Sequence, residues 1–296
     1  MTRMSNDTLA AIHAAGLDLG DVHRVVMAAL VEDLRYGPDI TTQATVSPRA
    51  TGVGVVRSRA EGVLAGLPVA MAVLDLAGDG ELESVAILKD GDRLAPGDNA
   101  LEVRGRMVPM LRAERTMLNL LCHLSGVATE TRRWVAAVSG TGVTIRDTRK
   151  TLPGLRLLEK YAVRCGGGEN HRLGLGDAAL VKDNHVVAAG GVAEAVRAVQ
   201  EAAPGLTLEV ECDDVGQVRE ALDAGARTLL LDNMDIGQLR SAVRACRGYE
   251  GVVLEASGGL TLDQAAEVAA TGVTHLAVGA LTHSAVALDL GLDLEA

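Results

Sequence analysis

The feature that most constrains the fold is an alternation of short apolar runs and helical stretches, which begins at Val143. A strand followed by a helix, repeated along a chain, is typical of parallel βαβ units. The runs are apolar throughout and end in polar residues, which favours strands that are covered on both faces. The six runs are VTIRD, AALVKD, LTLEVEC, TLLLD, VVLEAS and HLAVG. Six strands are fewer than the eight of a complete barrel, so we predict an incomplete α/β (TIM-like) barrel, with a doubly wound sheet as the alternative.

The chain before this alternation has a different pattern. Residues 21–35 place apolar side chains at helical spacing. Residues 40–108 contain short Val-rich runs broken by turn signals such as KDGD and PGDN, which predict a small β-rich domain. A helical pattern returns over 107–138. We predict an N-terminal domain over 1–118, a barrel domain over 119–283, and a tail over 284–296 that packs near the first domain.

Composition excludes several classes of protein. The 296 residues carry a formal net charge of -11, with no Phe, one Trp and three Tyr. An acidic, aromatic-poor chain is poorly suited to binding nucleic acid, whether duplex or single-stranded. No uninterrupted apolar run is long enough to span a bilayer, so we expect no membrane partner and a cytoplasmic location. The cysteines lack the spacing of a zinc site and are expected to be small buried hydrophobes.

Positive charge nevertheless gathers between Arg146 and Lys182. Eight Lys or Arg residues face four acids there, a local balance of +4 (8 minus 4), around three consecutive glycines. Within this segment Arg156, Lys160 and Arg164 recur four residues apart, which is typical of the solvated face of a helix. The remaining basic residues need another explanation.

Ionisable residues also follow consecutive predicted strands. In α/β barrels the active site lies at the carboxyl ends of the strands. A sheet built only for stability does not need charges there, because burying unpaired charge is expensive. A buried salt-bridge ring is the structural alternative, but charge clusters at barrel mouths favour a functional site. The strand-end residues are Arg149, Lys150, Lys182, Glu211, Asp232, Ser257-Gly258-Gly259 and Gly279-Ala280.

The last two strand ends are small-residue turns. Thr261 and Gln264 fit a capping box, so Ser257-Gly258-Gly259 is expected to enter a helix N-terminus, where phosphate binds readily. The last two strand loops of a barrel frequently hold phosphate. Other motifs carry less weight: there is no G-x-S-x-G elbow, and the glycine triplet lacks the spacing of a nucleotide fingerprint. His123 and His185 are expected to be structural, whereas His171 stands beside Arg172.

These segments together resemble a known family. The stretch RDTRKTLPGLRLLEKYAVRCGGGENHRLGLGDAALVKDNH, with EVEC, LLLDN, EASGGL and HLAVGALTH following in order, is similar to quinolinate phosphoribosyltransferase. The likeness also covers EDLRYGPDITT (32–42) and RAERTMLNLLCHLSG (112–126), so it runs along nearly the whole chain. It implies an N-terminal α+β open sandwich, an incomplete barrel, and a homodimer or an assembly of dimers.

The resemblance also implies an activity and roles for residues. The family joins quinolinate to phosphoribosyl pyrophosphate, with magnesium, and releases nicotinate mononucleotide, pyrophosphate and CO2 in NAD biosynthesis. Quinolinate would be held by Arg149, His171, Arg172 and Lys182, with Arg115 from the partner subunit. Lys150 and Lys182 would face pyrophosphate, and Glu211 and Asp232 the ribose hydroxyls and the magnesium complex, which makes these four the expected catalytic residues. No direct metal ligand is assigned. The 5′-phosphate would lie on Ser257, Gly258, Gly259, Gly279 and Ala280, with Thr148 and Val278 beside the substrates.

Two alternatives stay open at this point. One is a paralogous phosphoribosyltransferase that acts on another anion, and the other is a non-catalytic sensor of phosphoribosyl pyrophosphate. The acids Glu211 and Asp232 argue against a sensor, because binding a polyanion gains nothing from two further negative charges. The basic set favours a dicarboxylate over a monocarboxylate. Cys165 and Glu169, within the glycine segment, have no assigned role.

Overall fold

The computed structural model describes residues 4–295 and divides into two compact units. The first unit runs to Arg132 and also contains Thr151–Gly167 and the residues from Leu281 onward. The second contains Arg133–Lys150 and Gly168–Ala280. The boundary predicted at 118/119 lies inside helix α5 (Met107–Ala137), and the units divide fourteen residues later.

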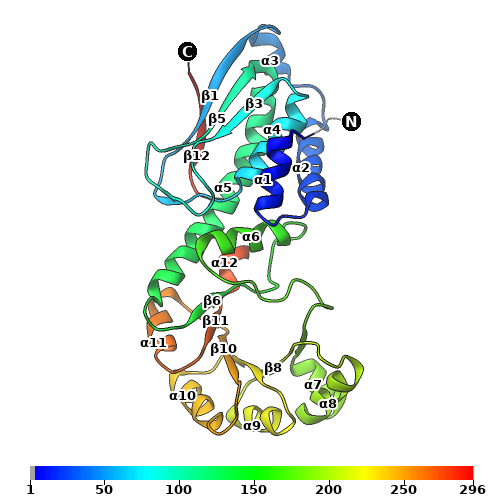
Figure 1. The fold of residues 1–296 in the computed structure, drawn as a ribbon, viewed down its shortest axis with the longest axis vertical. Coiled ribbons are helices and arrows are strands. Elements are labelled where there is room, and N and C mark those ends of the chain that lie inside the picture. The colour runs from blue at the N-terminus through cyan, green and yellow to red at the C-terminus, as the bar shows by residue number, and fades with distance from the viewer. Residues whose placement is uncertain (1–3, 296) are drawn as a thin grey trace. The chain divides into compact units, whose positions relative to one another are not determined.

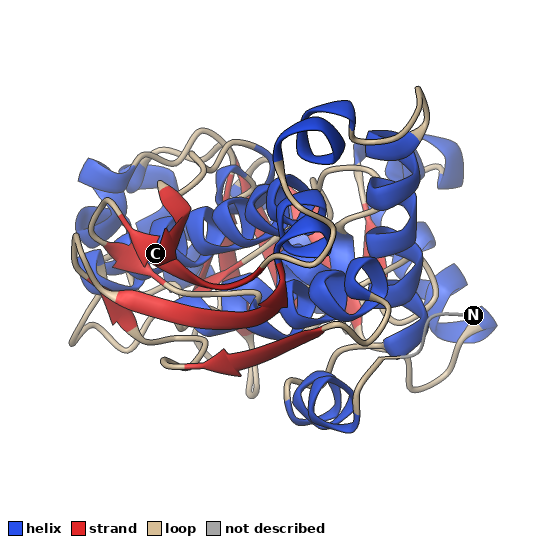
Figure 2. Cartoon of the chain, turned by 90° about the horizontal axis from the view of Figure 1, so that it is seen from above, coloured by secondary structure: helices blue, strands red, loops and turns tan. Residues whose placement is uncertain are grey.

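The first unit contains a four-stranded antiparallel sheet in the order β12-β1-β5-β3. Its strands are β1 (Thr51–Ser58), β3 (Leu82–Ala86), β5 (Asn99–Arg106) and β12 (Leu290–Glu295). Because β12 pairs with β1, the C-terminal segment completes this sheet (Figure 1; strands red in Figure 2). A short pair, β2 (Gly62–Val63) and β4 (Arg93–Leu94), accompanies it.

Among the described residues up to Gly167, six helices belong wholly or mainly to the first unit. They are α1 (Asn6–Ala14), α2 (Leu19–Leu34), α3 (Ile40–Thr45), α4 (Leu67–Gly78), α5 and α6 (Arg156–Gly166). The helical patterns predicted over 21–35 and 107–138 are confirmed by α2 and α5. The β-rich pattern predicted over 40–108 is confirmed by β1, β3 and β5, but the helix α4 within this segment was not predicted. Nearly every residue of α4 is buried, so its sequence has no polar face and no helical periodicity.

The solvated helix face predicted for Arg156, Lys160 and Arg164 was also wrong in part. Arg164 is exposed, but the side chain of Lys160 is fully buried within α6. A spacing of four residues identifies one face of a helix without saying what covers that face. In α6 this face is buried at its central residue, Lys160, and exposed at Arg164.

The second unit is built on a six-stranded parallel sheet in the order β6-β11-β10-β9-β8-β7. β6 and β7 are the two edges, so the sheet does not close, and the predicted incomplete barrel is confirmed (Figure 1). All six predicted runs form strands. Their bounds are β6 Thr144–Arg146, β7 Ala179–Val181, β8 Leu208–Cys212, β9 Thr228–Asp232, β10 Val253–Ser257 and β11 His275–Ala277.

Successive helices cover the outer face of this sheet, each packed on the next (Figure 1). They are α7 (Asp183–Ala189), α8 (Val192–Ala202), α9 (Val215–Asp223), α10 (Ile236–Ala245) and α11 (Ala265–Ala269), and the short α12 (Ala280–His283) follows β11. Strand residues alternate between faces, so Val210, Leu229 and Leu254 point towards these helices.

The opposite face of the sheet differs from the prediction. The strands were read as apolar throughout, but Glu209 and Glu255 are charged, buried residues in the middle of β8 and β10. They alternate with the apolar residues and therefore face the interior of the open barrel. Across the described residues, no helix is both long and apolar enough to cross a membrane.

Candidate active site

The carboxyl edge of the parallel sheet brings a lysine and two acids together. Lys182 follows β7, and its Nζ lies 2.5 Å from Oε2 of Glu211 on β8. Asp232 ends β9, where its Oδ2 accepts a hydrogen bond of 2.6 Å from the side chain of Asn233. Since β7, β8 and β9 are neighbours, the predicted catalytic residues Lys182, Glu211 and Asp232 share one edge.

Three basic side chains lie at the same end of the unit. Arg149 and Lys150 follow β6 and are exposed, which does not fit a buried salt-bridge ring. Arg172 lies before β7, and its Nη1 donates to the carbonyl of Ala178 at 3.1 Å. Burial lowers the pKa of Arg172, and the charge of Arg149 lowers it further. Two arginines close enough to repel each other form a place where an anion is strongly stabilised.

The turn after β10 is tightly built. Gly258 has φ +87°, and a Cβ there would lie 2.3 Å from Oδ1 of Asn233. The backbone amide of Asn233 in turn donates to the carbonyl of Ser257 at 2.9 Å. Only glycine fits this contact, so the turns after β9 and β10 are locked together. Asn233 itself has φ +52°, and sequence reasoning missed it, although it stands in the quoted segment LLLDN.

The capping box predicted at Thr261 and Gln264 is absent from the structure. Thr261 precedes a three-residue 3₁₀ helix (Leu262–Gln264), and its side chain makes no capping hydrogen bond. The turn Gly279-Ala280 leads into the four-residue α12. Val278, just before it, is buried, with its amide bonded to the carbonyl of Arg146 at 2.9 Å. These turns therefore offer backbone amides to the predicted phosphate, without a long helix behind them.

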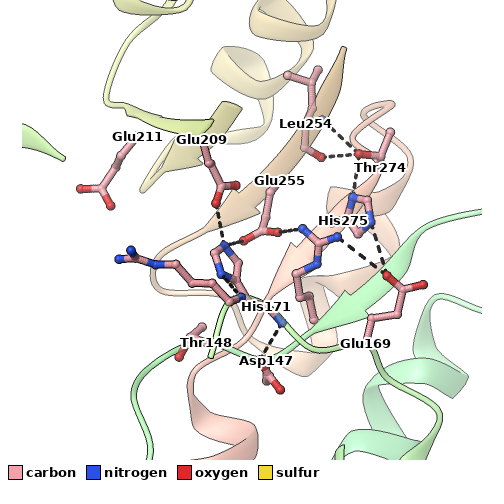
Figure 3. Close-up of polar contacts among 12 residues, drawn as sticks. Asp147, Thr148, Glu169, His171, Glu209, Glu211, Leu254, Glu255, Thr274 and His275 are labelled. Atoms are coloured by element: carbon pink, nitrogen blue, oxygen red, sulfur yellow. Dashed lines mark hydrogen bonds and ion pairs between the residues drawn. The ribbon is translucent and has the colours of Figure 1, made fainter. Parts of the chain in front are cut away.

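Below this edge lies a buried polar cluster that sequence reasoning missed apart from His171. Nε2 of His171 lies 2.6 Å from Oε2 of Glu209 and 3.6 Å from Oε1 of Glu255 (Figure 3). Nη1 of Arg146 donates to Oε2 of Glu255 at 2.7 Å. Burial, reinforced by repulsion from Glu209, raises the pKa of Glu255 to about 7. The signal in the sequence was a charged residue inside each of the runs LEVEC and VLEAS.

Two groups of carboxylates could be considered for a cation. Glu211 and Asp232 offer oxygen ligands at the open edge, the type that Mg²⁺ prefers. His171, Glu209 and Glu255 place one ligand atom each within 4.8 Å of one another. Arg146 and His171 already hydrogen-bond one oxygen of each acid, so we treat this second group as a hydrogen-bonded network, in which Oε1 of Glu209 and Oε1 of Glu255 have no hydrogen-bond partner among the described residues.

The remaining predicted residues lie as follows. Thr148 is half-buried, and its Oγ1 accepts from the amide of Lys150 at 3.0 Å. Arg115 is on α5 in the first unit. The two histidines expected to be structural are hydrogen-bonded within the protein: His123 is 2.8 Å from Glu159, and His185 accepts from the amide of Lys182 at 3.0 Å. Burial raises the pKa of the Cys165 thiol to about 12, which makes it unreactive near neutral pH.

An open parallel barrel with lysines, arginines and acids on its carboxyl edge defines an α/β-barrel enzyme that acts on small anions. Family comparisons agree in detail. The model for the quinolinate phosphoribosyl transferase C-terminal domain matches residues 127–293, and the model for the N-terminal domain matches residues 39–125. The chain belongs to the quinolinate phosphoribosyl transferase family.

Relatives and solved structures are similar over nearly full length. A nicotinate-nucleotide pyrophosphorylase [carboxylating] from Mycobacterium leprae is 54% identical over 91% of this chain and 95% of its own length. A probable enzyme of the same name from Bacillus subtilis is 39% identical over 89% and 90%. The solved nicotinate-nucleotide pyrophosphorylase from Francisella tularensis has a TM-score of 0.88 at 35% identity, covering 94% of this chain and 98% of that chain.

Proposed function

We propose that this protein transfers the phosphoribosyl group of phosphoribosyl pyrophosphate to quinolinate, with decarboxylation, in the synthesis of NAD. The products are nicotinate mononucleotide, pyrophosphate and CO2. Family membership supports the reaction class, and the names of the relatives support the substrate. The single observation that carries the assignment is the mixed-charge edge, where the Lys182–Glu211 pair and Asp232 lie on neighbouring strands.

Both substrates are polyanions, so binding requires locally concentrated positive charge in an acidic protein. Arg149 and Arg172 suit the two carboxylates of quinolinate, because a planar guanidinium binds a carboxylate through two parallel hydrogen bonds. Lys182 adds a third positive charge beside them. The mutual repulsion of the arginines is relieved when a dianion enters, which favours binding.

The residues of this edge divide the work of the reaction. As the bond from the ribose C1′ to pyrophosphate breaks, Lys150 and Lys182 stabilise the departing charge, and Glu211 and Asp232 stabilise the positive ribose. The pyridine nitrogen then forms the new bond to C1′. Its positive charge lets the 2-carboxylate leave as CO2, and the electron pair left on the ring carbon takes up a proton. Positioning and electrostatics suffice, without a covalent enzyme intermediate.

Magnesium is the cofactor we propose. The carboxylates of Glu211 and Asp232 fit a hard cation, since both offer oxygen atoms at the open edge of the sheet. When bound together with phosphoribosyl pyrophosphate, the ion supplies charge neutralisation of the pyrophosphate. The 5′-phosphate would lie against the amides of Ser257, Gly258 and Gly259 and of the turn at Gly279-Ala280, as frequently happens at the last two loops of a barrel.

We also propose a homodimer in which Arg115 serves the site of the partner subunit. Mixing two inactive variants, Arg115→Ala and Arg149→Ala, tests this arrangement. A heterodimer contains one site with both arginines, so mixed protein should regain part of the wild-type activity after subunit exchange. Proven heterodimers without recovered activity would show that Arg115 does not act across the interface. A cytoplasmic location remains a prediction.

One assay tests the function directly. The protein is mixed with quinolinate, phosphoribosyl pyrophosphate and Mg²⁺, and nicotinate mononucleotide and CO2 are measured. We expect product with quinolinate and very little with nicotinate, which lacks the 2-carboxylate. Each charged group of the protein that this leaves without a partner costs about 1–3 kcal/mol of binding free energy. Tight binding of phosphoribosyl pyrophosphate without any product would favour the sensor. Turnover of a different anion would favour the paralogous transferase.

A further inference from the structure

Buried charge beneath the strand ends requires an explanation. Glu255 has no exposed surface and Glu209 is 4% exposed. Arg146 balances one of the two negative charges through its 2.7 Å bond to Glu255. Apolar residues of similar volume often stabilise a core as well as buried ion pairs do, or better. Stability alone therefore does not explain why these two acids are buried.

The hydrogen bonds around His171 define which ring nitrogen carries a proton. The backbone amide of Arg172 lies 2.7 Å from Nδ1 of His171, and an amide N–H can only donate. Nδ1 must therefore be the unprotonated acceptor. Nε2 lies 2.6 Å from the carboxylate of Glu209, which can only accept when ionised, so Nε2 carries the proton. The ring is the neutral Nε2–H tautomer, with both nitrogens bonded inside the protein (Figure 3).

The same ring fixes the backbone that presents Arg172. The amide of His171 donates to Oδ1 of the buried Asp147 at 2.9 Å, and the side chain of Asn170 donates to Oδ2 at 2.6 Å. The amide of Arg172 donates to the His171 ring. The segment from Asn170 to Arg172 is thus held from β6 through Asp147 and from β8 through Glu209.

We propose that Glu209 and Glu255 are positioning residues for Arg172, acting through His171. They hold the imidazole as its Nε2–H tautomer. In that state Nδ1 of the ring accepts a hydrogen bond from the amide of Arg172, which fixes the backbone that carries the Arg172 guanidinium. His171 then supports the quinolinate site and is not itself a charged carboxylate ligand. The inference rests on the proposed function, in which Arg172 binds quinolinate.

The structure supports this role in two ways. First, Oε1 of Glu255 faces Nε2 of His171 at 3.6 Å, while its Oε2 is held by Arg146, so both acids lie against the ring nitrogen that carries the proton. Second, only 11% of the His171 side chain is exposed, although the residue lies beside the site. A ligand that gives N–H bonds to a substrate would present a ring nitrogen outward.

Nitrogen NMR tests the tautomer directly. The protein is labelled with ¹⁵N-histidine, and the His171 ring signals are assigned by comparison with His171→Asn. At pH 7.5 we expect the Nε2–H pattern both without and with saturating quinolinate. A doubly protonated ring on quinolinate binding, or an Nδ1–H ring in the free protein, would overturn the proposal. This measurement uses the wild-type protein and does not depend on a variant folding.

Kinetics of two Glu209 variants provide the second test. Glu209→Gln still offers an oxygen that accepts from Nε2–H, so its KM for quinolinate should stay within about threefold. Glu209→Leu removes the acceptor and should raise that KM at least about tenfold, because small displacements of a positioning group are costly. The KM for phosphoribosyl pyrophosphate should change less in both. If Gln is as harmful as Leu, a charged His171 is indicated and the proposal is wrong.

Glu159→Leu is the matched control, because Glu159 is also fully buried and bonded to a histidine, His123. We expect it to lower the melting temperature while raising the quinolinate KM much less than Glu209→Leu does. If the two variants raise the quinolinate KM equally, breaking any buried Glu–His pair has this effect, and Glu209 has no specific positioning role. Wild-type protein that forms no product overturns the proposed function and this inference together. If the wild type is active and Glu209→Leu has an unchanged KM for quinolinate, this inference is wrong while the proposed function stands.

Discussion

The surroundings of helix α4 in the first unit and the interior face of the parallel sheet in the second unit are built from different side chains. In the first, Val69, Ala72 and Val73 of α4 have no exposed surface and pack among other apolar groups. In the second, Glu209 and Glu255 are also buried but carry ionisable carboxyl groups. Apolar burial stabilises a fold by itself, whereas buried charge requires compensation. The apolar surroundings of α4 therefore stabilise the fold directly, whereas the buried acids of the second unit need Arg146 and His171 beside them.

The largest effect that we expect from this contrast is a loss of activity without a loss of stability. Arg149→Ala removes an exposed charge that we assign to quinolinate, so kcat/KM should fall by the equivalent of about 2–5 kcal/mol. The melting temperature should hardly change. Arg197→Ala, which removes an exposed arginine from α8, is the control and should leave both quantities unchanged. Saturation of the Arg149 variant at wild-type quinolinate concentrations would show that the residue does not bind this substrate.

The converse is expected in the first unit. Leu74→Ala in α4 deletes a side chain that is 1% exposed, and should lower the free energy of unfolding by about 3 kcal/mol. At a temperature where the variant is folded, KM for both substrates should remain at wild-type values. Denaturant unfolding and steady-state kinetics measure the two quantities. A large change in KM with unaltered stability would contradict the division between the two interiors.

A smaller effect is expected at the turn after β10. Gly258→Ala places a Cβ against Asn233 at positive φ, and should raise the KM for phosphoribosyl pyrophosphate by the equivalent of about 1–3 kcal/mol. Gly251→Ala is the matched control, since it also has positive φ (+70°) but no atom within 4 Å of the added Cβ. Equal behaviour of the two variants would mean that backbone strain alone, and not the Asn233 contact, determines the result.

The last expected effect concerns pH, and is a change in the slope of stability with pH. The pKa of Glu255 is raised from 4.5 to about 7, so the folded protein holds a proton that the unfolded chain releases. This contribution stabilises the fold fully below about pH 4.5 and is lost as pH rises through about 7. Relative to Glu255→Gln, the wild type should therefore lose unfolding free energy between about pH 5 and pH 8. Urea unfolding across this range measures the difference, and a wild type that gains stability would refute the shift.

Sequence patterns predicted one unit better than the other. The six parallel strands were found because short apolar runs alternate regularly with helical stretches along this part of the chain. Helix α4 was missed because an entirely buried helix has no distinct apolar stripe. Lys160 was placed in solvent because spacing alone does not reveal what packs against a helix face. Periodicity reports an element only where one side of it meets water.

The strand-end residues of the site follow from the sequence, because parallel strands bring their carboxyl ends to one edge whatever their order. That rule places Lys182, Glu211 and Asp232 together without coordinates. The network at His171 does not follow from it. His171 and Glu209 are 38 residues apart, and their contact depends on sheet order, register and the path of the segment before β7. Only the tertiary structure decided which acids meet the imidazole and which tautomer it adopts, because hydrogen-bond direction is set by atoms that distant parts of the chain bring together.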